Sequence, residues 1–98
     1  MIQHVVLVKW KSSTTTAQQE ASVEMVRGLT KKNPGISNFS SGNQCSIEGL
    51  GKGFHRVFQM TFKDAKVRVE YLDDPEHKKV VEIIFPLLDD IIVLDYEF

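Results

Sequence analysis

A chain of 98 residues, of which 42% are hydrophobic and 26% charged, can bury one core but not two. Its net charge of −1 provides no basic excess to displace counterions from phosphates, which argues against a nucleic-acid-binding protein. The sequence contains no apolar run near the roughly 18 residues that a membrane span needs. One cysteine excludes an internal disulfide and, with an N-terminus unlike a signal peptide, favours a reducing compartment. We therefore expect a single soluble, cytoplasmic domain over residues 1–98.

The first half of the chain predicts a strand, a helix and a second strand. Residues 2–10 are rich in β-branched side chains on both faces, as in a strand that is covered on both sides. Thr16 and Gln19 have the spacing of a capping box, and the helix that follows should end near Lys32. The apolar stripe of this helix, at i, i+4 spacing, consists of Ala17, Ala21, Met25 and Leu29. Residues 36–47 predict an edge strand with a bulge, because Ser, Gly and Asn interrupt them.

The most strongly patterned strand covers residues 54–62. Alternation places several large side chains on the same face as Arg56, namely Phe54, Phe58, Met60 and Phe62. Arg56 is therefore expected among aromatic rings. There it either binds an anionic ligand or forms an ion pair with Asp95 or Glu97.

Two short helices are predicted next. Asp64 is placed to cap a helix over residues 65–72. Asp74 and Pro75 then have the pattern of a second helix start, because proline has no amide hydrogen to lose at the first helical position. Pro86 should kink this second helix or end it early.

The end of the chain predicts a last strand over residues 91–96. The adjacent carboxylates of Asp89 and Asp90 point apart on a regular element, so they indicate a solvated turn rather than a metal site. The resulting order is β-α-β-β-α-β, which is typical of an α+β, ferredoxin-like fold with an antiparallel sheet. Helices cover only one face of such a sheet, whereas these strands are apolar on both faces. We therefore expect a homodimer in which two sheets pack face to face as a dimeric α+β barrel.

The second helix start brings two titratable rings together. Tyr71 falls at the end of one short helix and His77 in the first turn of the next, so both rings are expected at one cavity. In a catalytic interpretation, His77 is a general base that the helix N-terminus keeps neutral, and Tyr71 orients a substrate or stabilises an oxyanion. In a structural interpretation, His77 hydrogen-bonds at the helix start and Tyr71 is a core ring. The same two interpretations remain for His4, whose ring either meets a backbone carbonyl or serves a site.

Four segments together resemble the stress-responsive dimeric α+β barrel family. They are residues 4–11, 53–62, 71–77 and 94–96, with the motifs His4-Val5-Val6, Gly53-Phe54, Tyr71-Leu72, Asp74-Pro75-Glu76-His77 and Leu94-Asp95-Tyr96. The family includes plant heat-stable proteins and a polyketide cyclase. The resemblance covers nearly the whole chain and implies the same ferredoxin-like dimer, which some plant relatives assemble into a larger ring.

The resemblance also implies a pocket between the sheet and the helices. The cyclase's catalytic Tyr and His fall on Tyr71 and His77, and they close a linear polyketide by an aldol reaction without a cofactor. Further candidate ligand-binding residues are His4, Val6, Val23, Val26, Arg56, Phe58 and Val81. No His or Cys spacing in this sequence is typical of a metal site. Some relatives bind magnesium through main-chain carbonyls, and the corresponding stretch is Asn33 to Phe39.

Two functions follow. The first is that of a stress-responsive dimer without a defined reaction, which binds a small hydrophobic or anionic molecule in its pocket. The alternative is a cofactor-free, cyclase-like enzyme that uses Tyr71 and His77. A continuous cavity that reaches both rings favours the enzyme, whereas side chains that fill this space favour the structural protein.

Overall fold

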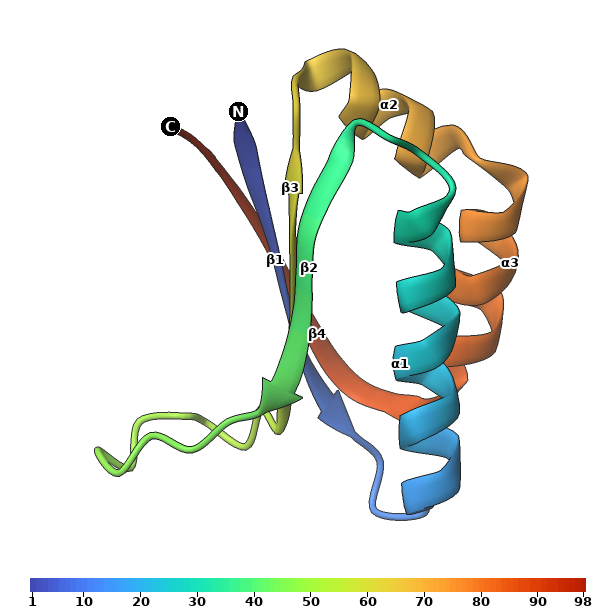
Figure 1. Ribbon diagram of the computed structural model, residues 1–98. Helices are drawn as coiled ribbons and strands as arrows, with labels where there is room; N and C mark the ends of the chain where they lie inside the picture. The colour runs from blue at the N-terminus through green and yellow to red at the C-terminus, as the bar shows by residue number, and fades with distance from the viewer.

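The computed structural model describes residues 1–98 and contains one antiparallel sheet with a layer of helices. The strands, in the spatial order β2-β3-β1-β4, are β1 (Ile2–Trp10), β2 (Ile36–Asn43), β3 (Arg56–Phe62) and β4 (Leu88–Glu97). The helices are α1 (Thr16–Lys31), α2 (Ala65–Asp73) and α3 (Pro75–Ile84). All three lie on one face of the sheet, and the other face is open (Figure 1). This is the α+β, ferredoxin-like arrangement that the sequence predicts.

Helix α1 begins one residue earlier than predicted. The hydroxyl of Thr15, not that of Thr16, accepts a hydrogen bond from the amide of Gln18, and the Gln18 side chain accepts one from the amide of Thr15. Because Thr15 and Thr16 are adjacent, as are Gln18 and Gln19, the local sequence allows the capping box to form at either threonine. Thr14 fixes the capping position at Thr15, because Thr14 is buried and its hydroxyl donates a hydrogen bond to the carbonyl of Leu87 at 2.7 Å.

The predicted stripe of α1 is accordingly wrong in part. Ala17 and Ala21 are exposed. The buried side chains of the helix are Ser22, Val23, Leu29 and Thr30, and Met25 is half-buried. Val23 packs in a core cluster with Val8, Trp10, Phe58, Ile84 and Leu88. A second core cluster, centred on Met60 and Phe62, fills the space under α2.

The middle strands are shorter than predicted. Strand β2 ends at Asn43, and β3 starts at Arg56. The bulge expected in edge strand β2 is present between Ser37 and Ser40, where Asn38 has a φ of 56°. Residues 44–55, which we call the arm, leave the sheet and project away from the helices (Figure 1).

The last strand is longer than predicted. Pro86 ends α3 as expected, and a 3₁₀ turn over Phe85–Leu87 leads directly into β4. The carbonyl of Leu87 accepts a hydrogen bond from the amide of Lys11, which aligns the start of β4 with the end of β1. The turn predicted at Asp89 and Asp90 is therefore wrong, because both residues belong to β4.

Candidate functional site

A cavity of about 170 Å³ lies between the sheet and the helix layer, and its lining residues come from β1, β3 and β4 and from all three helices. It is lined by 16 residues, of which 14 are hydrophobic. Polar atoms reach it only from His4, Tyr71 and His77. Leu72, Phe85 and Val93 also line it and are exposed, so they form its mouth.

The junction between α2 and α3 positions two of the three polar side chains. Tyr71 lies in the last turns of α2, and Asp74 ends this helix and caps α3 by accepting a hydrogen bond from the amide of Glu76 at 2.9 Å. His77 then lies in the first turn of α3, as predicted. The ring centroids of Tyr71 and His77 are 4.5 Å apart. Lys32 at the end of α1 holds the junction through ion pairs with Asp74 at 3.1 Å and with Glu76 at 3.0 Å.

The third polar side chain, His4, is held by a carboxylate. It is 5% exposed, and its Nδ1 lies 2.6 Å from Oδ1 of Asp95, its neighbour on β4. The other carboxylate oxygen of Asp95 accepts a hydrogen bond from Nη1 of Arg68 at 3.3 Å. Because an ionised carboxylate only accepts hydrogen bonds, Nδ1 of His4 carries the proton, and Nε2 is left as the acceptor in the neutral ring. Of the two interpretations of His4, the one in which its ring meets a backbone carbonyl is wrong, because Nδ1 contacts the carboxylate of Asp95 instead.

The environment of the two rings at the helix junction keeps both uncharged at neutral pH. Burial raises the pKa of Tyr71 to about 12, and the negative charge of Asp74 acts in the same direction. Burial is also the main cause that lowers the pKa of His77, and the neighbouring His4 adds to it. Nδ1 of His77 is buried without a hydrogen-bond partner. Tyr71 is therefore a phenol, and His77 a neutral imidazole.

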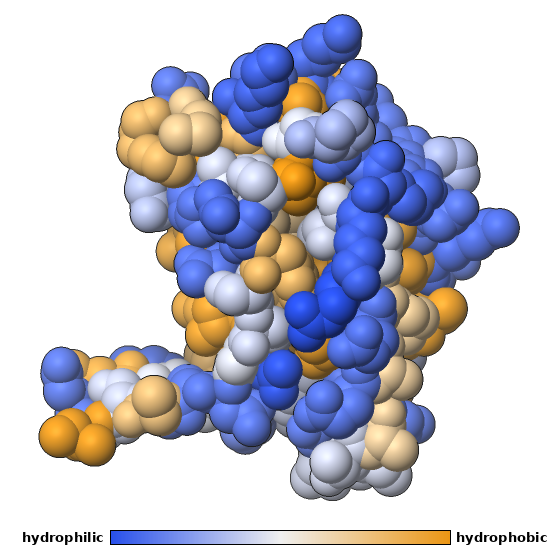
Figure 2. All heavy atoms as spheres, viewed as in Figure 1, coloured by the Kyte–Doolittle hydropathy of each residue, from blue (hydrophilic) through white to orange (hydrophobic).

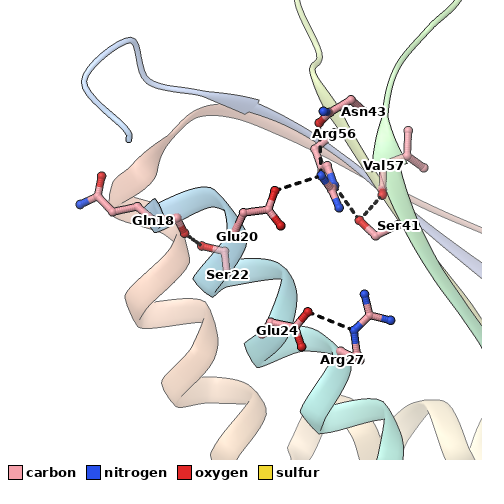
Figure 3. A network of polar contacts seen from close by, with 9 residues as sticks. All are labelled: Gln18, Glu20, Ser22, Glu24, Arg27, Ser41, Asn43, Arg56 and Val57. Carbon is pink, nitrogen blue, oxygen red and sulfur yellow. Dashed lines mark hydrogen bonds and ion pairs between the residues drawn. The ribbon is translucent and has the colours of Figure 1, made fainter. Parts of the chain in front are cut away.

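Arg56 lies elsewhere (Figure 3). Its guanidinium donates to Oγ of Ser41 at 2.9 Å and to Oδ1 of Asn43 at 3.3 Å, and it lies 3.7 Å from a carboxylate oxygen of Glu20. It is thus among polar groups rather than aromatic rings, and its acidic partner is on α1 rather than at Asp95 on β4.

The other predicted ligand-binding residues divide into two groups. The structure places Arg56 and Val23 outside the cavity, Val23 because it faces the core. The residues that do line the cavity are His4, Val6, Val26, Phe58 and Val81. Sequence reasoning did not select Asp95 for the site, although the β1–β4 register places it directly opposite His4.

Two further features concern metals and membranes. The stretch Asn33 to Phe39 covers the turn after α1 and the start of β2, and the carbonyls of Asn33 and Gly35 accept hydrogen bonds from the amides of Ile36 and Lys63. Magnesium at this stretch stays a prediction. No three His, Cys, Asp or Glu side chains lie close enough together to hold a metal ion.

None of the helices combines the length and the apolarity required to cross a bilayer.

Comparisons with a protein-family model and with curated sequences show which family the chain resembles. Residues 2–98 match the family described as Stress responsive A/B Barrel Domain. The stress-response A/B barrel domain-containing protein HS1 of Arabidopsis thaliana is 27% identical over 98% of this chain and 88% of its own length. Olivetolic acid cyclase of Cannabis sativa is 19% identical over 97% of this chain and 94% of its own length.

Solved structures share the fold over nearly the whole chain. The crystal structure of At3g17210 from Arabidopsis thaliana has a TM-score of 0.92 and 26% identity, and the match covers 100% of this chain and 95% of that one. A hydroxynitrile lyase from Passiflora edulis has a TM-score of 0.90 and 21% identity, with 97% and 90% covered. A protein from Thermobifida fusca, described as a dimeric ferredoxin-like protein, has a TM-score of 0.84 and 21% identity, with 99% and 90% covered. Because the family match spans almost every residue, this chain belongs to the stress-responsive A/B barrel domain family.

Proposed function

We propose that this protein binds a small, neutral, mostly apolar carbonyl compound and catalyses proton transfer on it. One observation carries the proposal: a single cavity is lined by His4, Tyr71 and His77. A protein with only a structural role is expected to fill this space with side chains. The open cavity therefore favours the cofactor-free enzyme over the stable dimer without a reaction.

The size and charge of the cavity restrict the ligand. Its volume of about 170 Å³ is similar to that of an engineered apolar cavity of roughly 150 Å³ that binds benzene. This corresponds to one ring or a short branched chain. The cavity wall contains no cation, since Arg56 is paired with Glu20 outside it. An anionic ligand would lose its hydration there without compensation, so we expect a neutral one.

His4 is the proton acceptor in this mechanism. When Nε2 of His4 takes a proton from the carbon next to the carbonyl, the ring becomes an imidazolium. The carboxylate of Asp95, 2.6 Å from Nδ1, stabilises that charge and fixes the ring orientation. His77 has no carboxylate in hydrogen-bond contact, and burial disfavours its charged form, so the geometry favours His4 over His77 as the base.

Tyr71 and His77 act on the carbonyl oxygen. Both keep their protons at neutral pH and can donate a hydrogen bond to the negative charge that develops on this oxygen. A histidine at a helix N-terminus that works as a neutral imidazole is a known way to polarise a carbonyl. The electron pair of the broken C–H bond moves into the enolate, and the proton on His4 returns to carbon or oxygen in the next step.

The names of two relatives, a cyclase and a hydroxynitrile lyase, suggest reactions that such a proton acceptor would serve. An aldol closure, as the name of the cyclase suggests, starts from the enolate. Cleavage of a hydroxynitrile starts instead with loss of the hydroxyl proton, after which the C–C bond to cyanide breaks and cyanide leaves with the electron pair. The small cavity favours the compact hydroxynitrile as a second candidate substrate over a long linear polyketide.

The test is hydrogen–deuterium exchange at the methyl group of acetophenone, followed by NMR in D₂O. We expect the protein to accelerate the exchange, His4→Gln to abolish the acceleration, and Tyr71→Phe and His77→Gln each to reduce it. His55→Gln is the matched control, because His55 lies outside the cavity and its substitution should leave the rate unchanged. Mandelonitrile cleavage is measured with the same variants.

The proposal fails if exchange is not accelerated and if neither acetophenone nor mandelonitrile shifts the ring signals of His4 and His77. The remaining function is then that of a stable, stress-responsive dimer without a reaction.

We propose further that a second copy of the chain covers the open face of the sheet. Adjacent strands place apolar side chains there in a continuous patch: Val5, Leu7, Val57, Ile92 and Leu94. At the rim, Lys9 lies opposite Asp90. This neighbouring pair of opposite charges suits a twofold interface, in which one patch meets a copy of itself. The description of the Thermobifida fusca relative as dimeric supports this arrangement.

A further inference from the structure

The arm, residues 44–55, takes no part in the candidate site. It extends from the ends of β2 and β3 toward the side of the sheet that carries no helices (Figure 1). The loops that join neighbouring antiparallel strands are usually about 2–5 residues long, so the connection between β2 and β3 is much longer than this pairing requires. The arm contributes no residue to the cavity.

The base of the arm is firmly attached. The amide of Gln44 donates to the carbonyl of His55 at 2.8 Å, and the amide of His55 donates to the carbonyl of Val8 at 2.9 Å. The ammonium group of Lys9 lies 5.1 Å from the centre of the Phe54 ring. These contacts hold the arm in a fixed direction relative to the sheet.

The tip of the arm carries two large aliphatic side chains that do not pack against the rest of the chain. Ile47 is 100% exposed and Leu50 65% exposed. Figure 2 shows hydrophobic atoms beside hydrophilic ones at the end of the arm, well separated from the body of the molecule. Two large aliphatic side chains exposed to water on a projecting arm indicate a surface that another molecule covers.

We propose that the arm is a clasp that docks Ile47 and Leu50 on a second copy of this chain. The proposal rests on the proposed dimer, because the arm borders the same open face that the second copy covers. The partner's arm does the same in return, so the two clasps lie on either side of one twofold interface.

The length of the arm fits this occupant. Each limb has about six residues and spans at most roughly 20 Å when extended. Two sheets packed face to face lie about 10 Å apart. The tip is therefore able to pass the plane of the partner's sheet and to pack against the partner's flank.

The charge of the arm argues against other occupants. Its charged side chains are Glu48 and Lys52, whose charges cancel. An anionic membrane surface or a nucleic acid attracts segments with a clear excess of basic residues. A neutral arm with aliphatic side chains at its tip suits a protein surface. Because the arm points toward the open face of the sheet, that protein is the second copy of the chain which covers this face.

The first experiment measures the dimer dissociation constant by analytical ultracentrifugation. The test variant is Ile47→Ser with Leu50→Ser. The control is Val69→Ser with Ile83→Ser, which removes side chains of 54% and 52% exposure from the helix side. None of the four side chains belongs to the buried core, so both variants are expected to fold.

We expect the dissociation constant of the arm variant to rise by roughly a hundredfold or more, since four aliphatic side chains per dimer lose their burial. The control should equal the wild type. A wild type that is monomeric at every concentration overturns both the dimer and the clasp. A dimer whose dissociation constant does not change in the arm variant overturns the clasp alone.

The second experiment uses Cys45, which is the only cysteine, is exposed and lies in the arm. A spin label attached there should lose mobility as protein concentration rises through the dissociation constant. The label should stay mobile in the arm variant at concentrations where the wild type is dimeric. A label whose mobility is the same in monomer and dimer shows that the arm does not dock and overturns the inference.

Discussion

The substitution His77→Gln should change how stability depends on pH. Burial lowers the pKa of folded His77 below its ordinary value of 6.5, so between the two values the unfolded chain binds a proton that the folded chain does not. The free energy of unfolding contributed by His77 is therefore fully present above pH 6.5. It falls as the pH is lowered toward the folded-state pKa. His77→Gln removes this fall.

The size of the effect is bounded by the single proton involved. One proton changes the free energy of unfolding by at most about 1.4 kcal/mol per pH unit. The wild-type curve, measured by urea denaturation from pH 7.5 to 5, should therefore be steeper than the variant curve by up to this slope below pH 6.5. Carboxyl groups contribute equally to both proteins and cancel in the difference.

The structure also ranks the causes of the shift. Burial acts more strongly than the neighbouring His4. In His4→Gln the pKa of His77, followed by NMR, should therefore move toward 6.5 but remain below it. The chain has three histidines, which keeps the assignment simple.

Equal slopes for wild type and His77→Gln would refute the reasoning, as would an ordinary pKa for His77 in the NMR titration. Either result would mean that water reaches the ring freely. His77 would then be protonated over part of the physiological range, and its proposed role as a neutral donor to the carbonyl oxygen would fail with it.

Three further predictions concern the scaffold, each measured by urea denaturation. Thr15→Ala should reduce the free energy of unfolding by about 1 kcal/mol, whereas Thr16→Ala should have little effect, because only Thr15 caps α1; the reverse order would restore the register predicted from the sequence. Met60→Ala should cost about 2–5 kcal/mol, because Met60 is 1% exposed in the core under α2, and a loss below this range would mean that the core closes around the deletion. Gly35→Ala should cost about 1–3 kcal/mol, because a Cβ at this position overlaps the buried side chain of Val67; unchanged stability would mean that α2 moves aside freely.

Local patterns were enough to predict the order of the elements. The alternation in the strands, the cap at Asp64 and the helix start at Asp74-Pro75 are signals within a few residues of one another, and the structure contains all of them. Tyr71 and His77 were placed together for the same reason. They are six residues apart and joined by a helix junction whose shape Asp74 and Pro75 determine.

Contacts between distant residues were decided by the tertiary structure. Arg56 pairs with Glu20 rather than with Asp95, because β2, β3 and α1 approach one another only in the folded chain. The capping register of α1 likewise depends on the bond from Thr14 to Leu87, which is remote in sequence.

The candidate site also depends partly on local sequence signals and partly on contacts between distant residues. The chain's sequence is sufficient to identify Tyr71 and His77 as neighbours. The carboxylate that holds His4 comes from Asp95, 91 positions away, and it lies there because the first and last strands pair in one particular register. Helical and turn signals act over a few residues, but strand register depends on the packing of whole faces, and a slip of one residue would turn Asp95 away from His4.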